Sequence, residues 1–187
     1  AGAVSLFVND ITKISKYKNK NYIYGNTNFK NTFNLNYVNI KPSTNFLQSQ
    51  NKEYVNQFIK IEKNKKSNLI ELHNRPIYLR YLVKSLNKRT YILYFHNDPL
   101  SMNGSKSINE RLKLLDELDK IIFVSKWVQK RFFNGLDQKL LNKTEVVYPS
   151  INKISKFPSK KKWISFVGKL NSSKGYDIYK GAILKIL

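Results

Sequence analysis

The strongest constraint on the fold is a regular alternation of short apolar segments with amphipathic segments between residues 68 and 149. Proline opens one amphipathic segment at Pro76, and Ser107 and Glu110 have the spacing of a capping box before another. The expected strands are 68–72, 90–95, 120–124 and 144–148, and the expected helices are 76–86, 107–118 and 126–133. Strands that alternate with helices in this way predict an α/β fold with a parallel, doubly wound, Rossmann-like sheet.

The N-terminal third has a less regular pattern. Val4, Phe7, Val8 and Ile11 have the spacing of an amphipathic helix, which we expect over residues 3–15. Further elements are expected as a strand at 21–24, one partly exposed strand around Phe33, Leu35 and Tyr37, and a helix through 54–61 that ends in a lysine turn.

The helix at 3–15 follows Gly2 directly, whereas a helix of an α/β sheet normally follows a strand. The first strand is central in a Rossmann-like order. We therefore expect the chain, which begins on Ala-Gly without methionine, to be a fragment that lacks the middle strand of its own sheet.

The C-terminal stretch predicts the start of a second domain. An apolar segment that begins at Trp163 runs into a loop with Gly168, Lys169, Lys174 and Gly175, and then into a helix. We expect residues 1–150 to form a first Rossmann-like domain, 151–162 a linker, and 163–187 the first βα unit of a second Rossmann-like domain.

The charge has two interpretations. The 187 residues carry 34 Lys and Arg against 12 Asp and Glu, a formal charge of +22. Such an excess attracts nucleic acid or an anionic membrane. The abundance of Lys, Asn, Ile and Tyr is also what AT-rich coding produces, and most of the lysines are scattered. The sequence has no cysteine, no signal-peptide pattern and no apolar run near the ~20 residues of a membrane span.

Two histidines end neighbouring expected strands in matching contexts. His73 is followed by Asn74, Arg75 and proline, and His96 by Asn, Asp and proline. In a parallel sheet both lie at the carboxyl edge, where a histidine can bind a sugar hydroxyl or a phosphate. The alternative is that each histidine caps the next helix and that Asn and Asp form Asx turns. Because the two contexts match, we favour a site, with His96 as the stronger candidate.

The Gly/Lys loop is the second candidate. Lys169 and Lys174 can flank a diphosphate and offset its charge as it departs, although a solvated lysine turn is an equal alternative. Gly2 precedes a helix N-terminus, which can bind an anion. The common motifs of P-loop, dinucleotide-binding, metalloprotease and α/β-hydrolase enzymes are absent from the sequence.

Taken in order, these pieces resemble a GT-B glycosyltransferase of family 4. The resemblance runs from the Gly2 helix start, through the strand-end histidine and the segments 121–125 and 146–149, to the loop from Phe166 to Gly175. The family usually has arginine where this chain has Lys169, which keeps the charge but loses the bidentate fork. Its pair of glutamates belongs to the second domain, beyond the part seen here.

The resemblance implies a retaining, metal-independent transfer of a sugar from a nucleotide sugar. As a further hypothesis beyond the resemblance, we expect the acceptor to be a cell-envelope glycan or glycolipid, such as a lipopolysaccharide. The resemblance implies that Lys169, Lys174 and Gly2 bind the donor diphosphate and that His96 positions the donor sugar. His73, Asn74 and Arg75 are expected on the acceptor side by their position alone. The resemblance also implies a bacterial cytoplasmic enzyme and an inactive fragment. Peripheral contact with the inner face of the membrane is a hypothesis from the charge alone, which coding bias explains equally well. The alternatives are a non-catalytic nucleotide- or phosphate-binding module and a basic nucleic-acid-binding protein.

Overall fold

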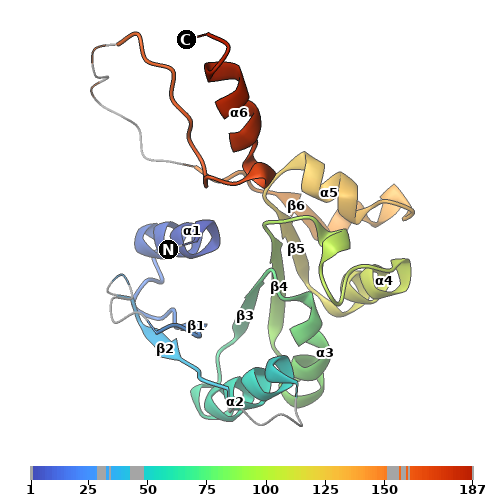
Figure 1. Cartoon of the computed structure of the whole chain (residues 1–187). Coiled ribbons are helices and arrows are strands. Elements are labelled where there is room, and N and C mark those ends of the chain that lie inside the picture. The colour runs from blue at the N-terminus through green and yellow to red at the C-terminus, as the bar shows by residue number, and fades with distance from the viewer. Residues whose placement is uncertain are drawn as a thin grey trace. The chain divides into compact units, whose positions relative to one another are not determined.

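A computed structural model of the chain describes residues 2–28, 33, 35–42, 49–150, 156, 159 and 161–186. The chain forms two compact units, Ala1–Ser150 and Ile151–Leu187 (Figure 1). Most of the expected linker at 151–162 lies outside the described residues.

The first unit contains a four-stranded, all-parallel sheet. Its strands are β3 (Leu69–His73), β4 (Thr90–Phe95), β5 (Lys120–Phe123) and β6 (Thr144–Val146), in the order β3-β4-β5-β6. Between them lie α3 (Pro76–Ser85), α4 (Ile108–Glu117) and α5 (Lys126–Phe132), with short 3-10 turns η1 (Pro99–Ser101) and η2 (Gln138–Lys143). The predicted α/β fold with a parallel sheet flanked by helices is thus confirmed, and its topology is compatible with a Rossmann-like fold.

The two central strands, β4 and β5, form much of the core, which explains why the sequence pattern predicted them. Leu93, Phe95, Ile121 and Phe123 of the two central strands are 0% exposed. Three rings, those of Phe95, Phe123 and Phe132, pack with centroids 5.3–5.8 Å apart. Central strands of a parallel sheet carry apolar residues on both faces, so they read as continuous apolar runs, although Ile92 and Tyr94 of β4 are only half-buried.

Local signals set the starts of two helices. Ser107 and Glu110 form the predicted capping box, with the Ser107 hydroxyl accepting from the Glu110 N–H and the Glu110 carboxylate accepting from the Ser107 N–H. The Ser125 hydroxyl accepts from the Val128 N–H and caps α5.

The N-terminal region adds α1 (Ala3–Ile14), β1 (Ile23–Gly25), β2 (Tyr37–Asn39) and α2 (Gln50–Lys65). The strands β1 and β2 pair in parallel as a separate two-stranded sheet. The strand predicted around Phe33, Leu35 and Tyr37 was placed wrongly: it begins only at Tyr37, and Phe33 sits in a turn at φ 61°. The alternation of aromatic and apolar residues there does not reflect an extended chain.

The two faces of the larger sheet carry different helices. Helix α2 packs beside α3, and α3 beside α4, over the face that presents Tyr91, Leu93 and Phe95 (Figure 1). Successive side chains of a strand point to opposite faces, so Tyr94 lies on the other one. There it meets Phe7 of α1 at a ring distance of 5.9 Å, which places α1 on that second face.

In the second unit, η3 (Ser172–Lys174) leads into α6 (Tyr176–Ile183), as the predicted loop and helix require. The strand predicted from Trp163 is wrong. Among the residues that the structure describes, the segment 163–168 has no neighbouring strand to pair with. Trp163 and Val167 are accordingly 74% and 95% exposed. An apolar run becomes a strand only when a second strand satisfies its backbone.

Candidate functional site

The two predicted histidines meet at the carboxyl ends of β3 and β4. His73 is the last residue of β3 and pairs in register with Tyr94, and His96 directly follows β4. Nδ1 of His73 lies 3.0 Å from Nε2 of His96, so the two rings share a hydrogen bond. The Nε2 atom of His73 lies 3.7 Å from a carboxylate oxygen of Glu71. The strand ends therefore present a coupled pair of imidazoles, with a carboxylate beside His73.

Asn74 fastens the two strand ends to each other. Its N–H donates to the Tyr94 carbonyl at 2.9 Å, and its side-chain oxygen accepts from the His96 N–H at 2.8 Å. The residue has φ 54°, a left-handed conformation that asparagine tolerates better than most residues. Its side-chain oxygen thus already has a structural partner.

Arg75 is exposed and precedes Pro76, the first residue of α3. One guanidinium nitrogen donates to the Asn74 carbonyl at 3.1 Å. The structure thus brings the four residues 73–75 and 96 together at one edge of the sheet, as the sequence predicted for their position.

An aromatic wall surrounds the histidine pair. The ring of Phe7 meets His96 edge-on at 4.9 Å, and the rings of His73 and Tyr94 stack at 4.7 Å. The sequence analysis did not identify Phe7 or Tyr94 as site residues. The available signal was the apolar stripe on residues 3–15, since a helix at the carboxyl edge must place one of its apolar residues over the strand ends.

Burial sets the protonation state of this site. It lowers the pKa of His96 to about 4, with a smaller contribution from the charge of His73. It also raises the pKa of the Tyr94 phenol to about 12. At neutral pH, His96 is therefore an uncharged imidazole beside an uncharged phenol. Such a group can exchange hydrogen bonds with a hydroxyl, but it adds no positive charge for a phosphate.

Asp98, two residues after His96, has a structural role. Its carboxylate accepts from Arg131 at 2.8 Å and from the Leu100 N–H at 3.0 Å, so it ties η1 to α5. The hydrogen bond from Arg131 is the main cause that lowers the pKa of Asp98. This Asx cap is the one anticipated as the alternative for the segment after β4.

Gly2 precedes the first turn of α1, and its carbonyl accepts from the Leu6 N–H. The residue has φ −84° and ψ 165°, and a Cβ added there would meet nothing within 4 Å. Neither backbone conformation nor crowding requires glycine at this position. No side chain caps the helix start, so its first N–H groups have no side-chain acceptor.

Lys169 and Lys174 belong to the second unit and are both exposed. The loop closes around Asn171, whose carbonyl accepts from the N–H groups of Lys174 and Tyr176. Gly175 has φ 73° and allows the chain to turn into α6. The loop thus has the compact turn predicted for it.

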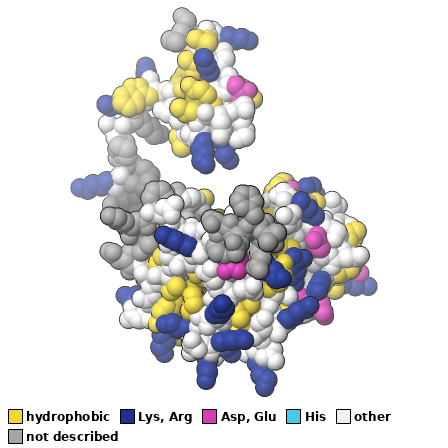
Figure 2. All heavy atoms as spheres, turned by 60° about the horizontal axis from the view of Figure 1, so that its bottom comes forward, with side chains coloured by type: hydrophobic (Ala, Val, Ile, Leu, Met, Phe, Trp, Pro, Cys, Tyr) yellow, Lys and Arg dark blue, Asp and Glu magenta, His cyan; other side chains and the backbone are white. Residues whose placement is uncertain are grey.

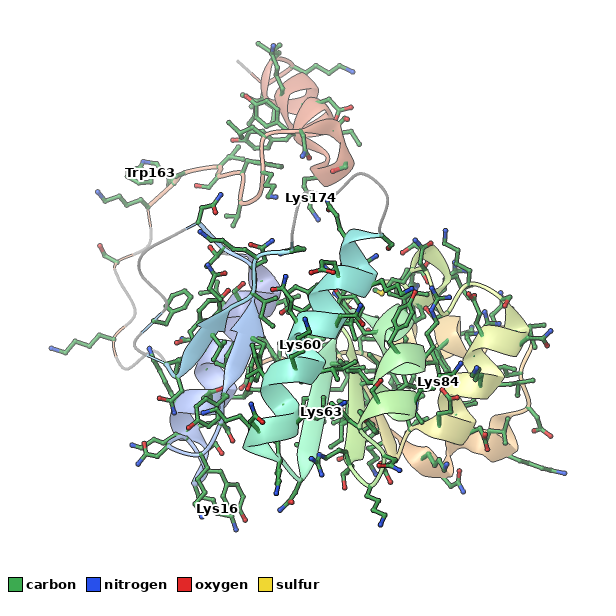
Figure 3. The ribbon with its side chains drawn as sticks, turned by 90° about the horizontal axis from the view of Figure 1, so that it is seen from below. Lys16, Lys60, Lys63, Lys84, Trp163 and Lys174 are labelled. Carbon is green, nitrogen blue, oxygen red and sulfur yellow. The ribbon has the colours of Figure 1, made fainter. Side chains whose placement is uncertain are left out.

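The positive charge is spread rather than gathered. Lysine and arginine side chains are dispersed over the face shown in Figure 2, with apolar and polar atoms between them. Lys60 and Lys63 of α2 and Lys84 of α3 are exposed along these two helices (Figure 3). Within the described ranges, no group of three or more His, Asp or Glu side chains could hold a metal ion. No described helix is long and apolar enough to cross a membrane.

Comparison with known proteins adds no relative. No protein-family model matches the chain, and neither the curated proteins nor the solved structures give a significant match. The features that bear on function are therefore the strand-end histidines, the Gly/Lys loop and the topology of the parallel sheet.

Proposed function

We propose that the chain is the acceptor-side domain and the opening of the donor-side domain of a retaining GT-B glycosyltransferase. In this proposal the enzyme moves a sugar from a nucleotide sugar to a cell-envelope glycan of the lipopolysaccharide type, without a metal ion. The observation that carries the proposal is the histidine pair at the carboxyl ends of β3 and β4. Open α/β sheets bind their ligands at this edge.

The neutral imidazole of His96 suits the donor sugar better than the diphosphate. Because its pKa is about 4, it can exchange a hydrogen bond with a sugar hydroxyl across the physiological pH range without changing charge. The shared hydrogen bond with His73 and the edge contact with Phe7 hold its ring in place. His96 then acts by orienting the sugar, which lowers the entropic part of the barrier.

The diphosphate is assigned to the cationic loop. As the bond between the anomeric carbon and the diphosphate breaks, negative charge grows on the nucleotide, and Lys169 and Lys174 offset it. The uncapped start of α1 at Gly2 adds N–H donors. On the acceptor side, the exposed guanidinium of Arg75 beside His73 and Asn74 suits an anionic glycan.

The test is transfer of labelled sugar from UDP-, GDP- and ADP-sugars to a lipopolysaccharide acceptor by the full-length protein. We expect Lys174→Ala to lower turnover about 100-fold or more, because it removes charge stabilisation at the leaving group. Lys180→Ala is the matched control, since it removes an exposed lysine from the same unit, and it should leave turnover unchanged.

The outcomes separate the alternatives. Donor binding without transfer would instead identify a nucleotide-binding module. If the folded protein binds no nucleotide sugar, the proposal of a donor site is wrong. We expect residues 1–187 alone to be inactive in this assay. Sugar transfer by them would contradict the assignment of the acceptor side to the first domain and of the donor side to the second.

Location and charge belong to the same proposal. We place the enzyme in the cytoplasm, in peripheral contact with anionic lipid and without a nucleic-acid partner. The +22 formal charge and the exposed lysines of α2 and α3 support the membrane contact. Co-sedimentation with vesicles that contain 30% anionic lipid, roughly a biological proportion, should fall steeply with added salt. Equal binding to neutral vesicles, or salt-sensitive binding to generic duplex DNA instead, would contradict it.

A further inference from the structure

A cavity of about 2050 Å³ lies within the first unit. On one side it is lined by α1 through Val4, Val8 and Ile11, and on another by α2 through Val55 and Phe58. The strands β1 and β3 also line it, β3 with all five of its residues, together with Tyr37 of β2, Tyr78 and Leu82 of α3 and parts of the loops between these elements. Because α1 and α2 lie on opposite faces, the cavity lies in the layer of the sheets, between a helix from each face.

The two strands beside the cavity are each paired on one side only. Among the described residues, β1 pairs with β2 alone and β3 with β4 alone, so each leaves one edge without a neighbouring strand. Leu69 at the start of β3 is 44% exposed. Unpaired edges in the middle of a protein are unfavourable because their backbone N–H and C=O groups lack partners.

Two side-chain atoms of the lining also lack partners. The Asn9 side-chain oxygen and the Tyr24 hydroxyl are buried without any hydrogen bond. Buried polar atoms are nearly always paired in folded proteins. An occupant that carries both N–H donors and C=O acceptors would satisfy these two atoms as well as both strand edges, and an extended backbone carries both.

The contacts of α1 fix the direction of such an occupant. Phe7 packs on His73, Tyr94 and His96, which places the N-terminal half of α1 over the carboxyl ends of β3 and β4. Gly2, at the start of α1, also lines the cavity. A strand that continues into α1 must therefore end at the same edge as β3 and run parallel to it. A helical crossover then leads from that strand to β1, as parallel pairing requires.

We propose that this cavity is the slot for a central β-strand, supplied by an extended apolar segment of the same polypeptide that leads through Gly2 into α1. The completed sheet has the order β2-β1-slot strand-β3-β4-β5-β6, which makes a single seven-stranded parallel sheet of the two observed ones. Because the slot is closed by α1 on one face and α2 on the other, the strand has to be apolar on both faces. The proposal rests on topology alone and is independent of the proposed sugar transfer.

The direct test adds the strand by design. A five-residue extension, Val-Ile-Val-Ile-Val, is placed before Ala1, and a matched control carries proline as its third residue, which cannot donate to a sheet. We expect the first extension to raise Tm by about 5 °C or more over the control, since each kcal/mol is worth about 2–4 °C in a chain of this size. A rise no larger than that of the proline control overturns the proposal.

Hydrogen exchange provides a second test, which starts from the unextended chain. We expect the amides of β1 and β3 to exchange at least tenfold faster than those of β4 and β5, and to become protected in the extended chain. Protection of β1 and β3 that already equals that of β4 and β5 overturns the proposal. Concentration-dependent dimerisation that protects the same amides overturns it too, because it identifies a second copy as the occupant.

Discussion

The sheet β3–β6 and the pair β1–β2 lie in the same unit, and both consist of parallel strands with apolar residues. In β4 every second residue is buried, and in β5 the last three are buried in succession. Neither β1 nor β2 contains a single buried residue. The difference follows from neighbours: β4 and β5 have a strand on each side, whereas β1 borders the cavity. Strand burial is thus a property of the whole sheet rather than of each segment.

The largest expected effect comes from removing the same side chain in both regions. Ile121→Ala in β5 deletes a 0% exposed side chain and should lower the free energy of unfolding by about 3 kcal/mol or more. Ile23→Ala in β1 deletes a half-exposed one and should cost about 1 kcal/mol or less. Urea unfolding measures both. Equal losses would show that β1 is as well packed as β5 and would contradict the difference in burial between the two regions.

Glycines offer a second matched pair. In Gly104→Ala, the new Cβ would lie 2.7 Å from the backbone nitrogen of Ile77, at a φ of +93°. Since backbone cannot yield as a side chain does, we expect a loss of about 2 kcal/mol. In Gly25→Ala of β1, the Cβ would meet only the outer end of the Tyr37 ring, which can move aside. Thermal unfolding should show a change of about 0.5 kcal/mol at most there. A larger loss at Gly25 would mean that Tyr37 is fixed.

The same contrast explains what could be predicted from the sequence. The strand at 90–95 was predicted with its exact bounds, and helix α3 to within one residue, because both are covered on the core side by continuous packing. The start of β2 and the strand from Trp163 were predicted wrongly. The start of β2 is set by its pairing with β1, in which Ile23 faces Tyr37, and the segment from Trp163 has no partner strand among the described residues. Local periodicity contains no record of either condition.

The candidate site divides in the same way. The matching contexts of His73 and His96 predicted that both lie at the carboxyl edge of the sheet, and they do. The hydrogen bond between them and the ring of Phe7 above them depend on side-chain placement in three elements. The roles of Lys169 and Lys174, which belong to the second unit, remain predictions.

The pH dependence of the free energy of unfolding tests how deeply the histidine pair is buried at the ends of β3 and β4. Between pH 6.5 and about 4 the unfolded state binds a proton at His96 that the folded state does not, so stability falls as the pH falls. After allowance for partial exposure, the loss over this range should be about 1–2 kcal/mol.

Urea unfolding at pH 7.5 and pH 5, values chosen to lie on roughly either side of the unfolded histidine pKa, measures this slope. His96→Gln should flatten it. His73→Gln should retain most of it, because burial is the larger cause of the lowered pKa. An unchanged slope in His96→Gln would show that another group titrates.

The smallest expected effect concerns α2, the helix that lines the slot. Lys66 ends this helix at φ 55°, ψ 43°, a left-handed conformation that glycine adopts without steric cost. Lys66→Gly should therefore raise the free energy of unfolding by about 0.5 kcal/mol. Lys60→Gly, an exposed position inside the same helix, should lower it by about 1 kcal/mol. Urea unfolding measures both changes in the free energy of unfolding. They have opposite signs only if α2 ends at Lys66 in solution. Two losses of equal size would mean that α2 continues past Lys66 toward β3. The wall of the slot that α2 forms would then differ from the one described.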